Sequence, residues 1–464
     1  MAPLRVAIIG GGPGGLVSAR ELCREGHSVT VYEAASQLGG VWVYTDETDS
    51  ELIGRDPEVM AFSDFPFDDS FPGSHDSRRF PEHTEVLAYL RAFAAANNVE
   101  PLIRLSSPVT RVSRMDDAAE GPIGKRWLVR SRAAFRDGCS GEDAAEYDAV
   151  VVSAGHNAEP RLPDYPGEAD FPGFIMHSHN YRQPEPFRGK TVVVVGASLS
   201  GTDLAQQIAE VADRVVLSSR NPRLLELLSQ DERFQEAKRD REATAQLCPP
   251  PTSLPLDVQF LPDVAHLEAD GRVVFTDGTT LDDVDAIVYC TGYRYTFPFL
   301  PPGILTAQDN HVRPLFGQVF PPDHLPSLSL IGVPWLCTPI PLMELQARWV
   351  ARTLSGRVAA PSREDMAAEM LAETEARRAL GFPDRYAHRL GKEFQQEYYD
   401  WLADRAGCAR TPQWFFDLYQ ACKDTLAQDR WGFRDAPLVD PEDAAGRARA
   451  AWASLGGERI DGTA

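Results

Sequence analysis

A strand, a glycine-rich loop, a helix and a second strand follow one another between Arg5 and Glu33, and this succession constrains the fold most strongly. The apolar run Arg5–Ile9 suits a buried strand of a parallel sheet. The loop after it has the spacing GxGxxG and further glycines, and its candidate contact residues are Gly10, Gly12, Gly14 and Gly15. The helix pattern ends at Gly26, and the next strand pattern ends at Glu33. This order is typical of a dinucleotide-binding unit.

The chemistry of a dinucleotide explains each position of this loop. Gly10 permits a tight turn, Gly12 lets the main chain approach a pyrophosphate, and Gly15 lets helix and strand pack closely. The free N–H groups at the start of the helix point toward the phosphates. Glu33 can accept hydrogen bonds from a ribose, and its charge repels a 2′-phosphate. The first loop therefore favours FAD or NAD over NADP.

A second glycine pair follows in the stretch LGGVW, from Leu38 to Trp42. Such a pair soon after the ribose-binding acid is a familiar companion of the first loop in FAD enzymes, where main chain passes beside the flavin. The candidate residues for this contact are Gln37, Gly40, Val41 and Trp42. Taken by itself, the stretch is equally well read as an ordinary turn.

The same plan recurs near the middle of the chain. Thr191–Val195 is a buried strand pattern, and the three loop positions hold Gly196, Ser198 and Gly201, with Ser200 between the last two. The following strand ends in Ser219 and Arg220 rather than in an acid, which indicates NADP. A charge-assisted hydrogen bond from Arg220 to a 2′-phosphate is worth about 1.5–3 kcal/mol, or roughly 10- to 150-fold over NAD. The alternative is a solvated surface arginine.

Each unit is followed by a strand that ends in a small-residue turn. DAVVVSAGH contains Gly155, and DAIVYCTGY contains Thr291 and Gly292, where main chain could pass close to a cofactor. Proline-rich segments at 157–173 and 295–303 mark two domain crossings. We predict an α/β fold with two Rossmann-like domains. The FAD domain comprises 1–165 and 305–464, an NADPH domain at 170–300 is inserted in it, and the cleft between them holds the reactants.

Charge and composition limit the partners and the location. The net charge is 46 − 68 = −22, which argues against nucleic acid and anionic membranes. The strand pattern starts too early to leave room for a secretory signal, and no stretch approaches ~20 uninterrupted apolar residues. The seven cysteines form no CxxC pair, as expected of reduced thiols in a cytoplasmic protein. The oligomeric state, a homodimer included, stays open.

The stretch FPGFIMHSHNY, with Phe171, Gly173, His177 and Tyr181, lies just before the second loop. Together with the two loops it resembles the fingerprint of the flavin-containing monooxygenases. Other stretches that look like family motifs are MAFSDFPF (Met60–Phe67), CTGYRYTFPFL (Cys290–Leu300) and ELQARW (Glu344–Trp349). The resemblance spans about residues 4–435. YTDETDS (Tyr44–Ser50) and the tail stretch Arg385–Cys408 are closer to the plant S-oxygenating branch.

The resemblance implies an NADPH-, FAD- and O2-dependent monooxygenase. Such an enzyme oxygenates a small thioether or amine, to a sulfoxide or N-oxide, through a flavin hydroperoxide, and needs no protein nucleophile. Gln346 in ELQARW resembles a residue near the flavin ring that could offer it an amide, or it is a helix-surface glutamine. Phe171 and Tyr181 are expected to anchor one in each domain. His177 is expected to tie the linker by a hydrogen bond, with proton transfer and ordinary burial as alternatives.

One position departs from the family pattern. Six residues before Met60 the family usually has an asparagine that hydrogen-bonds near the oxygen site, and this chain has Gly54. An ordinary hydrogen bond is worth ~1 kcal/mol, whereas a preorganised donor in a dry site is worth ~3–4 kcal/mol. On the larger figure, an NADPH oxidase releasing hydrogen peroxide becomes the alternative function. A water molecule beside Gly54 could replace the lost donor.

Other functions fit the sequence less well. Tyr181 followed by Arg182 argues against a Baeyer–Villiger monooxygenase, and the tail stretch EYYDWLA disfavours the auxin-forming branch. A disulfide reductase would need CxxxxC after the first loop, where Cys23 stands alone. A non-catalytic nucleotide sensor is the one alternative that is not an enzyme, and two intact loops disfavour it. The sequence does not name the substrate.

Overall fold

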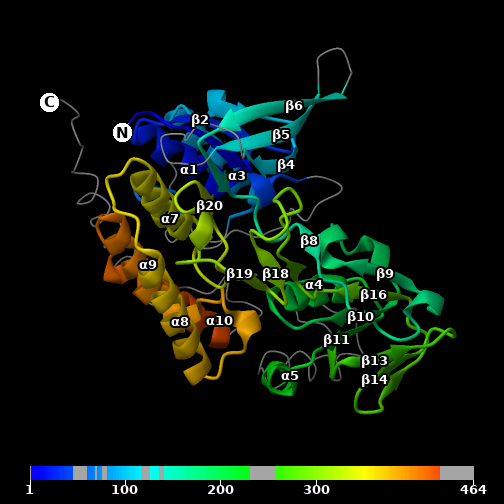
Figure 1. Cartoon of the computed structure of the whole chain (residues 1–464). Helices are drawn as coiled ribbons and strands as arrows, with labels where there is room; N and C mark the ends of the chain where they lie inside the picture. The colour runs from blue at the N-terminus through cyan, green and yellow to red at the C-terminus, as the bar shows by residue number, and fades with distance from the viewer. Residues whose placement is uncertain are drawn as a thin grey trace.

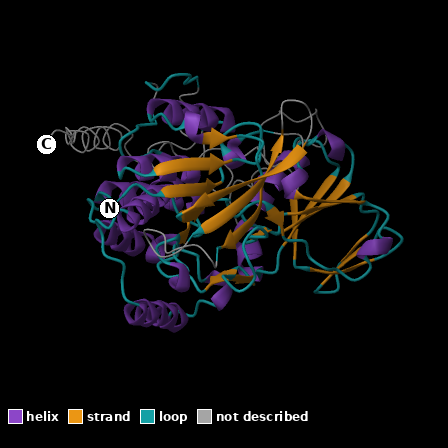
Figure 2. Cartoon of the chain, turned by 45° about the horizontal axis from the view of Figure 1, so that its top comes forward, coloured by secondary structure: helices purple, strands orange, loops and turns teal. Residues whose placement is uncertain are grey.

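A computed structural model of the chain describes residues 2–44, 60–67, 70–75, 81–115, 126–134, 140–229 and 258–428. It contains two five-stranded parallel sheets, each with an apolar core on both of its faces (Figures 1 and 2). In Figure 1 the green strands of the second sheet lie to the right of the yellow and orange C-terminal helices, below the blue and cyan N-terminal unit. The predicted mixed α/β class is confirmed.

The first sheet has the strand order β20-β7-β1-β2-β3. Its strands are β1 (Arg5–Ile9), β2 (Ser28–Tyr32), β3 (Ile103–Arg104), β7 (Ala149–Val152) and β20 (Leu328–Leu330). Successive residues of β1 enter opposite cores, with Val6 and Ile8 on one face and Ala7 and Ile9 on the other. Burial on both faces explains the continuous apolar run, because helices cover one face and further strands the other.

The second sheet repeats this arrangement in the order β12-β11-β10-β16-β9. Its strands are β9 (Phe174–His177), β10 (Thr191–Val195), β11 (Arg214–Ser218), β12 (Val258–Leu261) and β16 (Ala286–Tyr289). Val192 and Val194 of β10 face one core, and Val193 and Val195 face the other. The helix after its glycine-rich loop is α4 (Leu199–Ala209), and α5 (Pro222–Ser229) follows β11.

The chain leaves the first sheet and returns to it. β20 comes after the whole second sheet in sequence, yet it pairs with β7 of the first. The two crossing segments also pair with each other, as the antiparallel strands β8 (Glu159–Pro160) and β17 (Tyr293–Arg294). An inserted domain requires such a topology, and the domain boundaries given above stay a prediction.

Helices and smaller sheets complete the fold. The helices are α1 (Pro13–Arg24), α3 (His83–Ala96), α7 (Pro339–Leu354), α8 (Arg363–Ala379), α9 (Gly391–Ala406) and α10 (Gln413–Gln428). The antiparallel strands are β4 (Val109–Arg114), β5 (Trp127–Ala134), β6 (Ser140–Tyr147), β13 (Val264–Leu267), β14 (Val273–Phe275), β15 (Thr280–Leu281), β18 (Thr306–Gln308) and β19 (His311–Arg313). Across the described ranges, none of the helices has the length and apolar character that crossing a membrane requires.

Candidate active site

The first glycine-rich loop turns from β1 into α1 at the carboxyl edge of the first sheet. A Cβ atom on Gly10 would lie 2.2 Å from the Ser153 carbonyl oxygen, and one on Gly15 would lie 1.9 Å from the Gly10 carbonyl oxygen. A Cβ on Gly14 would lie 2.5 Å from the Ser153 hydroxyl. These glycines are therefore required by the packing of strand, loop and helix.

Gly12 differs, because a Cβ there would meet only the Gly40 main chain, at 3.6 Å. Gly12 is also the N-cap of α1, and no side chain caps this helix. The first-turn N–H groups are thus left for an external acceptor, and the space above Gly12 stays open. These two features fit the diphosphate of FAD.

Glu33 follows β2 at the same edge and is 8% exposed. One carboxylate oxygen accepts from the Gly11 N–H at 2.6 Å, and the other accepts from the Ala35 N–H at 2.7 Å. These contacts fix the carboxylate beside the loop and leave each oxygen a further lone pair. This placement suits a ribose hydroxyl pair, as the sequence predicts.

The LGGVW stretch packs directly on this loop. The Gly39 N–H donates to the Gly11 carbonyl oxygen at 3.0 Å, and a Cβ on Gly40 would lie 3.1 Å from the Gly12 Cα. Val41 is 38% exposed at the surface, whereas Trp42 is part of the core. Gln37 is half-buried and accepts a hydrogen bond from Arg91. Gly40 thus lies against the first glycine-rich loop, whereas the Trp42 side chain packs in the core.

Gly155 follows β7 with a φ of +73°, and a Cβ on it would meet nothing within 4 Å. Its neighbour His156 places Nδ1 3.0 Å from the Gly332 carbonyl oxygen, and burial lowers the pKa of this histidine. Gly332 lies just after β20, so the ends of two neighbouring strands are joined here. The turn at Gly155 has open space in front of it, as a cofactor contact requires.

Gln346 on α7 is completely buried. Its Oε1 accepts from the Gly332 N–H at 2.9 Å, and its Nε2 donates to the Tyr398 hydroxyl at 3.0 Å. The surface-glutamine alternative is therefore wrong. Both ends of the amide are engaged within the protein, and Gln346 thereby fixes the turn at Gly332, just after β20 of the first sheet.

A buried charge cluster that the sequence reasoning missed lies behind the first loop. Arg20 of α1 donates to Glu344 of α7 at 2.5 Å and to Asp64 at 2.6 Å. Arg348 contacts the same Glu344 oxygen at 2.5 Å, and Ser63 donates to both Glu344 oxygens. MAFSDFPF and ELQARW thus meet at this cluster. The sequence feature that could have indicated this cluster is Arg20, a charged residue within the apolar pattern of α1.

The second glycine-rich loop repeats the geometry of the first. A Cβ on Gly196 would lie 2.4 Å from the Cys290 carbonyl oxygen, and one on Gly201 would lie 1.6 Å from the Gly196 carbonyl oxygen. Ser198 is the N-cap of α4, its φ of −81° needs no glycine, and no side chain caps this helix. Ser200 is exposed in the first turn. This end of α4 is open to a phosphate in the same way.

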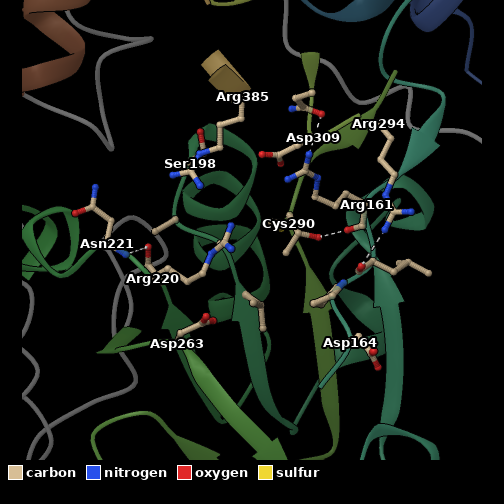
Figure 3. A pocket seen from close by; sticks show the side chains of 18 of the residues that line it. Arg161, Asp164, Ser198, Arg220, Asn221, Asp263, Cys290, Arg294, Asp309 and Arg385 are labelled. Carbon is tan, nitrogen blue, oxygen red and sulfur yellow. Dashed lines mark hydrogen bonds between the residues drawn. The ribbon is translucent and has the colours of Figure 1, made fainter. Parts of the chain in front are cut away.

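A pocket of about 1290 Å³ lies in front of this loop (Figure 3). It is lined at the second sheet by Gly196, Ser198, Ser219, Arg220, Cys290 and Thr291. From the crossing segments and from the later part of the chain come Arg161, Arg294, Asp309, Asn310, Arg385 and Tyr386. The pocket therefore has one wall from the predicted NADPH domain and one from outside it.

Arg220 extends from the end of β11 into this pocket (Figure 3). It is exposed, and no carboxylate of the described residues lies within ion-pair distance of it. Ser219 accepts a hydrogen bond from the Asn221 N–H at 3.2 Å, which leaves its hydroxyl hydrogen for another acceptor. A phosphate could thus meet Ser219 and Arg220 together.

Thr291 and Gly292 follow β16 and contact the first crossing segment. The Thr291 hydroxyl donates to the Arg161 carbonyl oxygen at 2.5 Å, and the Arg161 N–H donates to the Gly292 carbonyl oxygen at 2.8 Å. The Arg161 guanidinium donates to Asn310 at 2.9 Å. A Cβ on Gly292 would meet nothing within 4 Å, so this turn also has open space beside it.

The anchoring expected of the fingerprint aromatics is wrong. Phe171 and Tyr181 lie in the two cores on opposite faces of the second sheet, not one in each domain. The reason is that Phe174–His177 forms β9, the edge strand beside β16, so the segment belongs to the second sheet. The Tyr181 hydroxyl donates to Gln207 of α4 at 3.0 Å.

His177 ends β9 and is 4% exposed. Its Nδ1 accepts from the His179 N–H at 3.0 Å, and its ring lies 5.3 Å from that of Tyr293 beside the second crossing. Burial lowers the pKa of His177 to about 4. The ring is therefore neutral at pH 7, which favours the expected tie over proton donation.

Gly54 lies outside the described residues, so its place relative to the flavin edge stays a prediction. The sequence also did not indicate Asn310 and Arg385 as pocket residues. They come from segments far along the chain and share no motif with the second loop.

Comparisons with known proteins by sequence and by structure lead to the same family. A sequence model of the family described as flavin-binding monooxygenase-like matches residues 3–231 and 250–419. The chain is 43% identical over 430 residues to the flavin-containing monooxygenase FMO GS-OX-like 3 of Arabidopsis thaliana, covering 88% of each protein. The solved S-allyl-L-cysteine S-oxygenase of Allium sativum matches 98% of this chain and 99% of its own, with a TM-score of 0.82 and 36% identity.

An open structure of cyclohexanone monooxygenase matches 88% of this chain and 98% of its own, with a TM-score of 0.58. At 16% identity this match shows the fold alone. The shared fold consists of two Rossmann-like units, and it confirms the predicted fold class without adding a reaction.

Proposed function

We propose, from the premise that this chain belongs to the flavin-binding monooxygenase-like family, that it oxygenates the sulfur of a small thioether. Members of this family are FAD- and NADPH-dependent oxidoreductases, and this chain is one of them. The oxygen comes from O2 and the electrons from NADPH. Sulfur is chosen over nitrogen because a solved structure that matches 98% of this chain, at 36% identity, is an S-oxygenase.

One observation carries the assignment of the two cofactors. The chain holds two open helix N-termini, one beside Glu33 and the other beside Ser219 and Arg220. A carboxylate selects against a 2′-phosphate and an arginine selects for it. FAD is therefore assigned to the first unit, with its diphosphate at Gly12, and NADPH to the second.

When bound, FAD supplies the redox and oxygen-activating chemistry. The chain supplies binding, orientation and exclusion of water. Glu33 holds a ribose, Gln346 fixes the turn at Gly332, and Arg220 holds the coenzyme phosphate. His177 is buried and its pKa is lowered to about 4, so we assign it no role as a proton donor.

A second function is favoured by Gly54, which stands where the family usually has an asparagine. If no water replaces that hydrogen bond, much of the NADPH would be consumed with release of hydrogen peroxide. The two functions share every binding residue named above, so they differ only in the fate of the oxygen.

The test follows three quantities in one reaction. FAD-loaded protein receives NADPH and a simple thioether in air, and we measure NADPH consumed, sulfoxide formed and peroxide released. A matched reaction contains a tertiary amine instead, and a third contains no substrate. Sulfoxide in near one-to-one ratio to NADPH supports the proposal. Peroxide equal to NADPH in all three reactions would favour the oxidase, and N-oxide alone would move the substrate class to amines.

A further inference from the structure

The pocket in front of the second loop is lined on its far side by a charged residue from the C-terminal part of the chain. This residue is Arg385, in the 3-10 turn Asp384–Tyr386 between α8 and α9. In Figure 3 its side chain extends into the pocket toward the end of α4 that carries Ser198. The opposite wall belongs to the second sheet, so Arg385 faces the glycine-rich loop across the pocket.

The environment of Arg385 differs from that of its neighbours. Seven arginines lie between residues 363 and 410, and six of them form an ion pair with a carboxylate: Arg363, Arg377, Arg378, Arg389, Arg405 and Arg410. Arg385 is the seventh, and no carboxylate of the described residues pairs with it. It lies over the ring of Tyr386, 5.2 Å from the ring centre. Its charge is therefore available to a ligand.

The turn that carries Arg385 is held firmly, although the side chain is exposed. Asp384 accepts from both Nε and Nη of Arg378 at 3.1–3.2 Å. Arg377 donates to the carbonyl oxygens of Tyr386 and Arg389. These contacts tie the turn to α8, so little backbone order has to be gained when a ligand binds.

A second tie joins this turn to the β18–β19 hairpin. His388 accepts from the Val312 N–H at 2.8 Å, and its pKa is lowered to about 3, chiefly by burial. The hairpin tip, with Asp309 and Asn310, lines the same pocket. The far wall is thus held by contacts on both sides of Arg385, and they fix the main chain from which its side chain extends.

We propose that Arg385 binds the diphosphate of NADP(H), an inference that rests on the proposed function. Arg220 and Ser219 are at the end of the pocket suited to the 2′-phosphate, beside β11. Arg385 instead faces Ser198 and the open N-terminus of α4, where N–H groups favour an anion. A guanidinium adds paired donors to those N–H groups, which matches the geometry of phosphate oxygens.

The contact would link the coenzyme to the C-terminal part of the chain. With NADP⁺ bound, the second sheet and the turn at Arg385 are connected through the diphosphate. Loss of Arg385 should therefore increase the rate at which NADP⁺ dissociates from the pocket.

Titration calorimetry on the FAD-loaded protein tests the assignment with two probes. NADP⁺ carries both the diphosphate and the 2′-phosphate, whereas 2′-AMP carries only the latter. For Arg385→Gln we expect about 10-fold weaker NADP⁺ binding with 2′-AMP binding unchanged. For Arg220→Gln we expect about 10-fold weaker binding of both. Arg385→Lys should lie between wild type and Arg385→Gln.

The matched control is Arg363→Gln, an exposed arginine of the same region outside the pocket, which should bind both probes as wild type does. The inference is overturned if Arg385→Gln binds NADP⁺ as tightly as this control, or if it weakens 2′-AMP as much as NADP⁺. A wild-type protein that retains FAD but binds neither probe would instead remove the proposed NADPH site, and the role of Arg385 with it.

Discussion

The two glycine-rich loops share one main-chain geometry and differ in the groups they present. The interval in sequence from Gly10 to Gly196 equals that from Gly15 to Gly201, so the two loops align without a gap. In both loops a Cβ on the third glycine would overlap the carbonyl oxygen of the first, at 1.9 Å and 1.6 Å. The shared glycines are therefore demanded by strand–helix packing, and they do not distinguish the cofactors.

We infer that selectivity between the two cofactors lies at positions that the packing leaves free. In the same gap-free alignment, Glu33 corresponds to Ser219, Gly12 to Ser198 and Arg20 to Gln206. The first pair decides the charge near the ribose. The last pair shows that the first loop is supported by a buried ion cluster, whereas α4 has a half-buried glutamine at the matching place.

The largest expected effect is on the support of the first loop. Burial alone would raise the pKa of the Glu344 carboxyl, but Arg348 and Arg20 hold it below its usual value. Glu344→Gln leaves these two arginines without their central partner, and we expect a loss of about 3–5 kcal/mol in the free energy of unfolding. Urea unfolding followed by fluorescence measures it. Gln206→Met in α4 should cost under ~1 kcal/mol, and equal costs for the two variants would erase this difference between the units.

A smaller effect is expected for the amide that fixes Gly332. Gln346→Leu leaves the buried Gly332 N–H without its acceptor, and we expect about 1–3 kcal/mol of destabilisation. Gly332 lies just after β20, at the edge of the first sheet where we propose that FAD binds. The FAD content of the purified protein should therefore fall, while the affinity for NADP⁺ stays the same. The exposed Gln396→Leu on α9 is the control. A normal FAD content in Gln346→Leu would separate this residue from the flavin edge.

The pH dependence of stability should reveal His388, the buried histidine that joins the Arg385 turn to the β18–β19 hairpin. The pKa of His388 is lowered to about 3 in the folded protein, by burial first and by nearby His311 and Arg377 next. The unfolded chain therefore takes up the proton first. The neutral His388 therefore contributes to the free energy of unfolding in full above pH ~6.5. This contribution falls by up to ~1.4 kcal/mol per pH unit as the pH drops toward 3. His388→Gln lacks this titration, so its stability should approach that of wild type as the pH falls from ~6.5 to ~4.5. Parallel curves would contradict the burial of this group.

The smallest effect is expected in the second unit. Tyr181→Phe removes the hydroxyl that donates to Gln207 and keeps the ring in the core, so we expect a cost of about 1 kcal/mol in unfolding. FAD content should not change, because the fingerprint belongs to the second sheet. A loss of FAD in Tyr181→Phe would instead support the anchoring role between the domains that the sequence alone suggests.

Local patterns predict the strand before each glycine-rich loop to its ends. Arg5–Ile9 and Thr191–Val195 are observed with the bounds expected, because runs buried on both faces are bounded by glycine and polar residues. The stretch from Pro341 to Gly356 also has a helical spacing of apolar residues closed by a glycine, and the helix Pro339–Leu354 is observed there. Capping and turn signals mark such ends only to within a residue or two.

Contacts between distant segments are not predictable in this way. Phe174–His177 resembles a linker in the sequence because its pairing partner, β16, begins only at Ala286. The Arg20–Glu344 pair joins helices whose paired residues are 324 positions apart. Arg385 reaches the pocket only because α8 and the β18–β19 hairpin hold its turn there. Such sites depend on packing between distant segments, and the spacing of neighbouring residues in the sequence does not predict it.

The most direct test of the difference between the two units is the rate of FAD reduction by NADPH and by NADH. Anaerobic stopped-flow measurements give this ratio for wild type and for Arg220→Gln, with bound FAD counted in both. We predict a wild-type preference for NADPH of at least ~10-fold, its loss in Arg220→Gln, and an unchanged FAD content. Equal rates with both coenzymes in wild type, or a preference that survives the substitution, would contradict the assignment of NADPH to the second unit.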